Sequence, residues 1–187
     1  KISHIFVVTP IETHFEISKK FLFKKKKVLS EKPLILNKKQ SELIDYKFKN
    51  NLFVSYPYNY SKIIQKAKII SKKYKLGAPK FISINFSQAG RFNNNSVYQL
   101  FGRHVISISS QFFNLENFSI KKKNTNLFSK KNETGIYEIS KNRKIYIKAF
   151  ISTNYLFKKK KEIIIFFKNS NIFCDLTKSK KNIILRK

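Results

Sequence analysis

The stretch HIFVVTPIETHFEISKKFLFKKKKVLSEKP, His4 to Pro33, decides the fold of the N-terminal region. Its first residues are mainly apolar and β-branched and end at Pro10, which is typical of a buried strand in a parallel sheet. Thr13 and Glu16 then match a capping box, which predicts that a helix begins there. The apolar run VLS beyond the lysines is the next predicted strand. The stretch therefore predicts the order strand, helix, strand.

The same alternation continues beyond Pro33. Asn37 is a predicted helix N-cap before KKQSELIDYKFK, and LFVSY from Leu52 is a third predicted strand. Strands that alternate with helices form right-handed βαβ units on a parallel sheet. We therefore predict a parallel α/β domain over residues 1–60.

The pattern changes in residues 61–187, for which we predict a second, α+β domain. An amphipathic helix begins at Ser61, and KFISINFS predicts a strand over residues 80–87. A further helix is predicted over residues 97–113. It carries apolar residues and one histidine at four-residue steps: Leu100, His104, Ile108 and Phe112.

Residues after Thr134 consist of strand-like segments separated by short turns. This arrangement predicts a large, mostly antiparallel sheet. The lysine-rich residues 120–133 predict a mobile loop before it.

The charge is strongly basic, with 40 Lys+Arg against 10 Asp+Glu and a formal net charge of +30. Such a surface makes nucleic acid a candidate partner. The lysines, however, are spread along the whole chain, and arginine, which is preferred for bidentate phosphate and base contacts, is scarce. The abundance of Lys, Asn, Ile and Phe is also typical of an A+T-rich genome, in which surface positions drift to lysine. A non-catalytic basic protein that binds nucleic acid or another acidic surface stays as the alternative function.

The cysteine count and the hydropathy of the sequence indicate the cellular compartment in which we expect the protein. Cys174 is the one cysteine, which excludes an internal disulfide and a cysteine-type zinc site, and we predict no metal site. The sequence shows neither the run of about 18 apolar residues that a membrane span needs nor a signal peptide, so we expect a cytoplasmic protein with no membrane partner. It begins with Lys1 and contains no methionine, so we expect an N-terminally truncated chain.

The motifs together resemble the Gfo/Idh/MocA family, the NAD(P)-dependent oxidoreductases named for glucose-fructose oxidoreductase and inositol dehydrogenase. The stretch VVTPIETHFEISKKFLFKKKKVLSEKPLILNKKQSELI has the family's order of strand, T-P-x-x-x-H, helix, strand and E-K-P. NLFVSYPYNYSKIIQKAKIISKKYKLGAPKFISINFS resembles the next strand, the connecting helix and the first strand of the C-terminal domain. SVYQLFGRHVISI resembles the active-site helix. The resemblance implies the second half of a Rossmann-type parallel sheet, followed by an α+β domain with an open sheet.

The resemblance also implies the cofactor side of a site. NAD or NADP would be the cofactor, and five residues would border it: Thr9, Pro10, His14, Glu31 and Lys32. Lys32 would be catalytic, because a cation there can stabilise the oxyanion that develops during hydride transfer.

On the substrate side, His104 would face the reacting hydroxyl and take or give its proton. Tyr58, Asn59, Arg91 and His104 would bind a sugar, sugar-nucleotide or polyol. Family members commonly associate through the open sheet, which implies a homo-oligomer.

Three departures from the family pattern are visible. The phosphate-binding G-x-G-x-x-G is absent from this sequence. The family's aspartate four residues before the histidine is replaced by Leu100, or by Gln99 if one residue is inserted. The C-terminal sheet stops short of the family's last strands.

Overall fold

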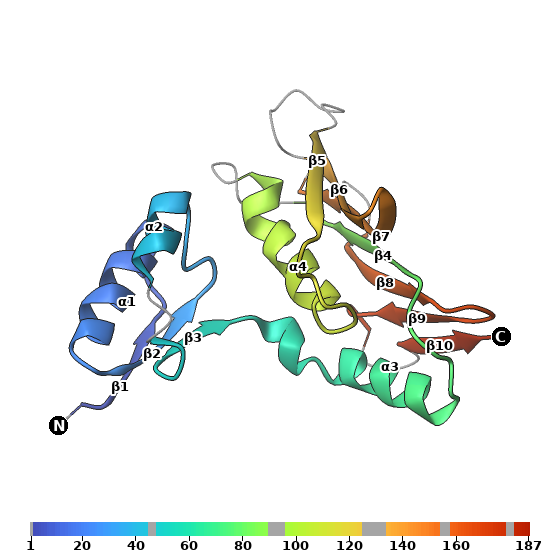
Figure 1. Ribbon diagram of the computed structural model, residues 1–187, viewed down its shortest axis with the longest axis horizontal. Coiled ribbons are helices and arrows are strands. Elements are labelled where there is room, and N and C mark those ends of the chain that lie inside the picture. Colours follow the sequence, from blue (N-terminus) through green and yellow to red (C-terminus); the bar gives the residue numbers. More distant parts are fainter. Residues whose placement is uncertain (1, 45–47, 90–95, 125–133, 154–157, 179–181) are drawn as a thin grey trace. The chain divides into compact units, whose positions relative to one another are not determined.

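The computed structural model describes residues 2–44, 48–89, 96–124, 134–153, 158–178 and 182–187. The chain consists of two compact units, Lys1–Pro57 and Tyr58–Lys187, each with its own sheet and its own hydrophobic core (Figure 1). The predicted domain boundary after residue 60 falls at the end of the short 3-10 helix η3 (Pro57–Tyr60), close to this division.

The first unit is a three-stranded parallel sheet with the order β1-β2-β3. Its strands are β1 (His4–Val7), β2 (Lys27–Glu31) and β3 (Leu52–Ser55), and its helices are η1 (Ile11–Thr13), α1 (His14–Phe23) and α2 (Lys38–Leu43). Leu22 of α1 packs with Val7, Val28 and Phe48 in a small buried cluster, which holds the helix on one face of the sheet. The predicted parallel α/β organisation is confirmed.

Of the two helix caps predicted in this unit, the one at Asn37 is confirmed and the one at Thr13 is wrong. The Asn37 side chain accepts a hydrogen bond from the Gln40 backbone N–H at 2.9 Å, as an N-cap does. Thr13 forms no side-chain cap; its hydroxyl donates to the Pro10 carbonyl at 2.7 Å instead. The reason is that η1 runs directly into α1, so Thr13 already has helical dihedral angles and does not stand at the start of a helix.

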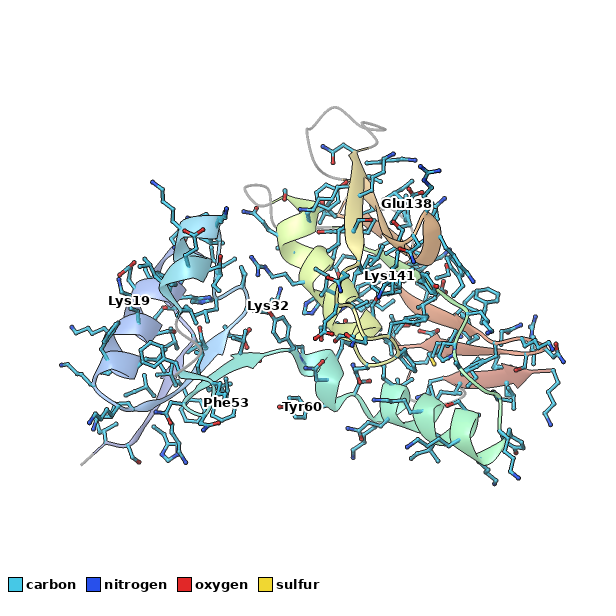
Figure 2. The ribbon with its side chains drawn as sticks, in the orientation of Figure 1. Lys19, Lys32, Phe53, Tyr60, Glu138 and Lys141 are labelled. Atoms are coloured by element: carbon cyan, nitrogen blue, oxygen red, sulfur yellow. The ribbon has the colours of Figure 1, made fainter. Side chains whose placement is uncertain are left out.

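The sheet face opposite α1 carries an apolar row. Phe6, Leu29 and Phe53 are cross-strand neighbours in register, and their exposed fractions are 69%, 37% and 51% (Phe53 is labelled in Figure 2). Parallel sheets usually bury both faces under helices. Among the described residues of this unit, α1 helps to bury one face of the sheet, and the apolar row on the other face stays exposed.

The second unit contains a seven-stranded sheet with the order β10-β9-β8-β4-β7-β6-β5. The strands are β4 (Phe81–Ser87), β5 (Ser119–Asn124), β6 (Thr134–Lys141), β7 (Lys144–Ser152), β8 (Lys160–Phe166), β9 (Asn171–Asp175) and β10 (Ile183–Arg186). Every neighbouring pair of these strands is antiparallel except β4 and β7, which are parallel. The predicted large, mostly antiparallel sheet is confirmed.

Helices cover one face of this sheet. They are α3 (Lys62–Lys73), the π-helical turn η4 (Tyr98–Gly102) and α4 (Arg103–Ser109). Alternate residues of the strands, such as Ile84 and Ile147, pack under Val105 and Ile108 of α4 in one large core. Alternation along the strands therefore directs one set of side chains into the core and leaves the other set outside.

The helix turn η4 approaches β6 closely through two glycines. A Cβ atom on Gly102 would overlap the ring of Tyr137, and one on Gly135 would overlap the ring of Tyr98. The two tyrosine rings contact each other edge to face, with centroids 4.9 Å apart. The absence of side chains at the two glycines is what lets the rings interlock.

Two other predictions differ from the structure. The loop predicted over residues 120–133 is wrong for residues 120–124, which belong to β5; residues 125–133 lie outside the described residues. All of β5 is exposed, so its sequence has no apolar alternation that would reveal a strand. The helix predicted over residues 97–113 begins with the π turn, and α4 ends at Ser109.

Candidate functional site

The carboxyl ends of β1 and β2 bring together the cofactor-side residues that the sequence predicted. Thr9 and Pro10 follow β1, and Glu31 and Lys32 stand at the end of β2. Because the two strands are parallel neighbours, these ends lie at the same edge of the sheet. Ligands of open α/β sheets bind outside this edge.

His14, at the start of α1, ties the two strand ends together. Its Nε2 lies 2.7 Å from the Thr9 carbonyl oxygen, and its Nδ1 lies 3.1 Å from the Pro33 carbonyl oxygen. The side chain is 3% exposed. Both ring nitrogens therefore face backbone carbonyls, and His14 contributes to the site by fixing the two loops.

Lys32 is half-buried in the loop after β2 (Figure 2). Its backbone N–H donates to the Glu31 carboxylate at 3.2 Å, and its peptide bond to Pro33 is cis. The carbonyl that His14 contacts belongs to this same Pro33, so the histidine holds the backbone immediately beside Lys32.

Three of the residues predicted on the substrate side, Tyr58, Asn59 and His104, lie close together within the second unit. His104 of α4 is 8% exposed and meets the Tyr58 ring edge to face, with ring centroids 4.9 Å apart. Asn59, the next residue, accepts a hydrogen bond from the Ser107 hydroxyl at 2.6 Å, and Gln111 donates to the Tyr58 carbonyl at 3.2 Å. The segment that contains Tyr58 is therefore held by Ser107 of α4 and by Gln111 just beyond that helix.

Burial changes the pKa of the Tyr58 phenol in this cluster. It raises the pKa of the Tyr58 phenol to about 12. The ring stays neutral at physiological pH and can act only as an apolar wall and a hydrogen-bond donor or acceptor.

Lys161 of β8 is a member of the cluster that the sequence reading missed. Its Nζ lies 5.7 Å from the centre of the Tyr58 ring and 6.0 Å from the centre of the Phe86 ring. Burial lowers the pKa of this amine. The signal was present in the sequence: Lys161 is in phase with the buried Ile163 and Ile165, so it points to the covered face of the sheet.

The remaining predicted positions have other outcomes. Arg91, predicted to bind substrate, lies outside the described residues. Gln99 and Ser96 form a reciprocal capping box: the Ser96 N–H donates to the Gln99 side chain at 3.0 Å, and the Gln99 N–H to the Ser96 hydroxyl at 3.3 Å. Gln99 thus caps the start of the helical turn η4, and Leu100 packs against the core, so neither supplies a carboxylate to His104.

Two features are absent from the described residues. No group of three or more His, Cys, Asp or Glu side chains is placed to hold a metal ion. Within the same residues, no helix is long and apolar enough to cross a membrane.

Comparisons with known proteins bear on the first unit and on the fold. Residues 1–55 match the family model described as "Oxidoreductase family, NAD-binding Rossmann fold", the Gfo/Idh/MocA model. This match confirms the resemblance that the sequence predicted for these residues. A search of curated proteins gave no match.

Solved structures share the fold at low identity. UDP-N-acetylglucosamine 3-dehydrogenase from Acidithiobacillus ferrooxidans has a TM-score of 0.82 and 14% identity, over 98% of this chain and 60% of that one. An inositol dehydrogenase homolog from Azotobacter vinelandii, complexed with NADH and myo-inositol, has a TM-score of 0.77 and 17% identity, over 100% of this chain and 56% of that one. An oxidoreductase from Pseudomonas syringae has a TM-score of 0.77 and 18% identity, over 100% of this chain and 56% of that one. The chain thus spans 60% or less of the length of these structures.

Proposed function

We propose, from the family match of residues 1–55, that the protein is part of an NAD(P)-dependent oxidoreductase that acts on a sugar, sugar-nucleotide or polyol. The observation that carries the proposal is the edge of the first sheet, where His14 joins the Thr9 turn to the loop that contains Lys32. The name of one structural relative, a UDP-N-acetylglucosamine dehydrogenase, and the myo-inositol bound to another support the substrate class.

The residues present fit one part of a dinucleotide. Thr9, Pro10, Glu31 and Lys32 lie at the carboxyl ends of parallel strands, where the reacting end of such a cofactor binds. The sequence contains four glycines and no G-x-G-x-x-G for the pyrophosphate. We therefore assign to this chain the contacts to the nicotinamide end and leave the choice between NAD and NADP open.

The chemistry divides between two side chains. A bound nicotinamide accepts or supplies the hydride. Lys32 stabilises the negative charge that develops on the substrate oxygen, since an ammonium group in a partly desolvated site favours an oxyanion. His104 takes the hydroxyl proton in oxidation and returns it in reduction. Leu100 offers no carboxylate to orient His104, and the Tyr58 ring contacts the imidazole edge to face.

The test is to measure NADH binding by nicotinamide fluorescence and turnover with myo-inositol and UDP-N-acetylglucosamine. Lys32→Ala should lower turnover by about a hundredfold or more, the scale of a lost oxyanion or acid/base group. Lys38→Ala is the matched control, because Lys38 is an exposed lysine nearby in the chain that forms an ion pair with Glu42 on its own helix. Unchanged turnover in Lys32→Ala would remove Lys32 from the mechanism, and absence of NADH and NADPH binding would contradict the proposal for this chain.

We propose a homo-oligomer formed through the uncovered face of the seven-stranded sheet. Ile164, Phe173 and Ile184 are cross-strand neighbours in register on that face, and the Phe81 and Phe166 rings lie 5.7 Å apart on the same side. An apolar face of this kind commonly marks an interface. Sedimentation of the protein and of Ile184→Lys tests the proposal, which fails if both are monomers at micromolar concentration.

The alternative function, a basic protein that binds nucleic acid, is favoured by the net charge of +30. It requires that affinity for RNA or DNA fall steeply as salt rises, with a log–log slope of several units. A flat salt dependence would exclude it. The compartment we propose for either function is the cytoplasm, whose reducing conditions suit the free, buried thiol of Cys174.

A further inference from the structure

Lys161 occupies an unusual position for a lysine in this protein. It is paired in register with Phe86 on β4, on the sheet face that the helices cover. Its ammonium group contacts the faces of Phe86 and Tyr58, at 6.0 Å and 5.7 Å from the ring centres. Many other lysines lie on exposed surface, whereas this one is half-buried between two aromatic rings.

The carboxylates nearest to Lys161 along β8 and β9 either point away from it or pair with other groups. Glu162 follows Lys161 in β8 and therefore points to the opposite face of the sheet. Asp175 of β9 accepts from the Thr177 hydroxyl at 2.6 Å and pairs with Lys178 at 3.2 Å. Among the described residues, no carboxylate forms an ion pair with Lys161.

A half-buried ammonium without an anionic neighbour is costly, since burial removes hydration that no counter-charge replaces. Aromatic faces offset part of this cost through cation–π attraction. An anionic group on a ligand would supply the missing counter-charge for the Lys161 ammonium group. His104 and Lys161 both contact the Tyr58 ring, which places the proposed proton-transfer group and the ammonium group in one cluster.

We propose that Lys161 binds the anionic group of the substrate, a carboxylate or a phosphate, beside Tyr58 and His104, so that the substrate is an acidic or phosphorylated sugar or polyol. This inference rests on the proposed function, whose substrate class it narrows. Lys161 acts in it as a specificity-determining residue and takes no part in the hydride or proton transfer.

The arrangement also predicts the protonation change on binding. Burial lowers the pKa of Lys161, and an anion beside it raises that pKa again, because the positive form gains a partner. A ligand that binds through this lysine therefore holds it in the charged form, and its affinity weakens at high pH when the amine loses its proton.

The experiment is a ligand-observed NMR titration of the full chain with glucuronate, glucose 6-phosphate and glucose, with and without NAD⁺. These probes separate a carboxylate site, a phosphate site and a site for neutral sugar. We expect one of the two anions to bind at least about tenfold more tightly than glucose, a gain that one charge-assisted hydrogen bond provides. Lys161→Gln should abolish that preference, and Lys161→Arg should retain most of it.

Lys122→Gln is the matched control. Lys122 also lies over two tyrosine rings, at 5.5 Å from the centre of Tyr98 and 5.8 Å from that of Tyr137, but on β5 at the other end of the strand order. It should leave the anion preference unchanged. Thermal melts of all variants report whether each one folds.

Several results would overturn the proposal. They are equal affinity for glucose and both anions, no sugar binding with or without NAD⁺, and a loss in Lys122→Gln equal to that in Lys161→Gln. Because the titration records binding and needs no turnover, a failure of hydride transfer leaves it interpretable. Anion preference without NADH binding would contradict the proposed function and leave the Lys161 site standing.

Discussion

The two units each have a sheet with helices on one face, but they bury very different amounts of apolar surface. In the first unit the covered face centres on Val7, Leu22, Val28 and Phe48, and the opposite face leaves Phe6 69% exposed. In the second unit a continuous core runs from α3 and α4 across the strands of the large sheet. The first unit has less packing to stabilise it, and the backbone contacts of His14 carry more of its local order.

The largest expected loss of stability comes from truncating one buried side chain in each core. Leu22→Ala and Ile147→Ala each remove a fully buried side chain, and each should cost about 2–5 kcal/mol. Because the first core is small, Leu22→Ala should abolish hydrogen-exchange protection in β1 and β2 and leave β4 and β7 protected. Ile147→Ala should lower the stability of the second unit without unfolding it. Equal loss of protection in both units for either variant would show that they unfold as one.

The next largest loss of stability is expected from filling the space beside Gly102 in the second unit. Gly102→Ala places a methyl group against the Tyr137 ring and should cost about 3 kcal/mol in urea unfolding, the upper part of the range for overpacked cores. Gly77→Ala is the control: it has open space around it and a φ of +79°, so strain alone should cost about 1 kcal/mol. Tyr137→Phe in the Gly102→Ala background should recover part of the loss, since the phenol oxygen is among the overlapping atoms. No recovery would contradict the close packing.

His14→Phe should cost the first unit about 1–3 kcal/mol, because the Thr9 and Pro33 carbonyls lose the polar ring that faces them. Hydrogen exchange should rise in the loops around Thr9 and Lys32 and stay unchanged in the second unit. His14→Gln keeps one donor group and should restore part of the order. Lys20→Gln on the same helix is the control, since Lys20 is exposed. Equal exchange in all three variants would show that His14 does not hold the two loops.

The smallest effect is a pH dependence confined to the second unit. Burial alone would raise the pKa of Asp175, but hydrogen bonds from Thr177 and the nearby Lys178 outweigh it and lower that pKa below its ordinary value. The carboxylate therefore contributes stability that is fully present above the unfolded pKa and is lost as pH falls through the folded pKa. Asp175→Asn should remove this contribution, about 1 kcal/mol, from acid unfolding curves of the second unit. An identical acid transition in the variant would refute the assignment.

Local patterns predicted most of the elements because they depend on neighbours in the sequence. The Asn37 cap, the strands at β1 and β2, and the helix that carries His104 are of this kind. The cap at Thr13 was predicted wrongly because a 3-10 turn precedes α1, and the exposed strand β5 was missed because it has no apolar alternation. The family resemblance, not periodicity, directed attention to Thr9, Lys32 and His104.

The sequence by itself determined the two kinds of sheet, the helix cap at Asn37 and the match of residues 1–55 to a family model described as an NAD-binding Rossmann fold. Only the tertiary structure decided that β4 lies between β7 and β8, strands more than fifty residues later in the chain. That strand order brings Lys161 of β8 beside Phe86 of β4 and the ring of Tyr58, where it meets the neighbour of His104. The physical reason is that a repeating apolar pattern specifies which face of a strand is buried, whereas the choice of neighbouring strand depends on packing between distant segments.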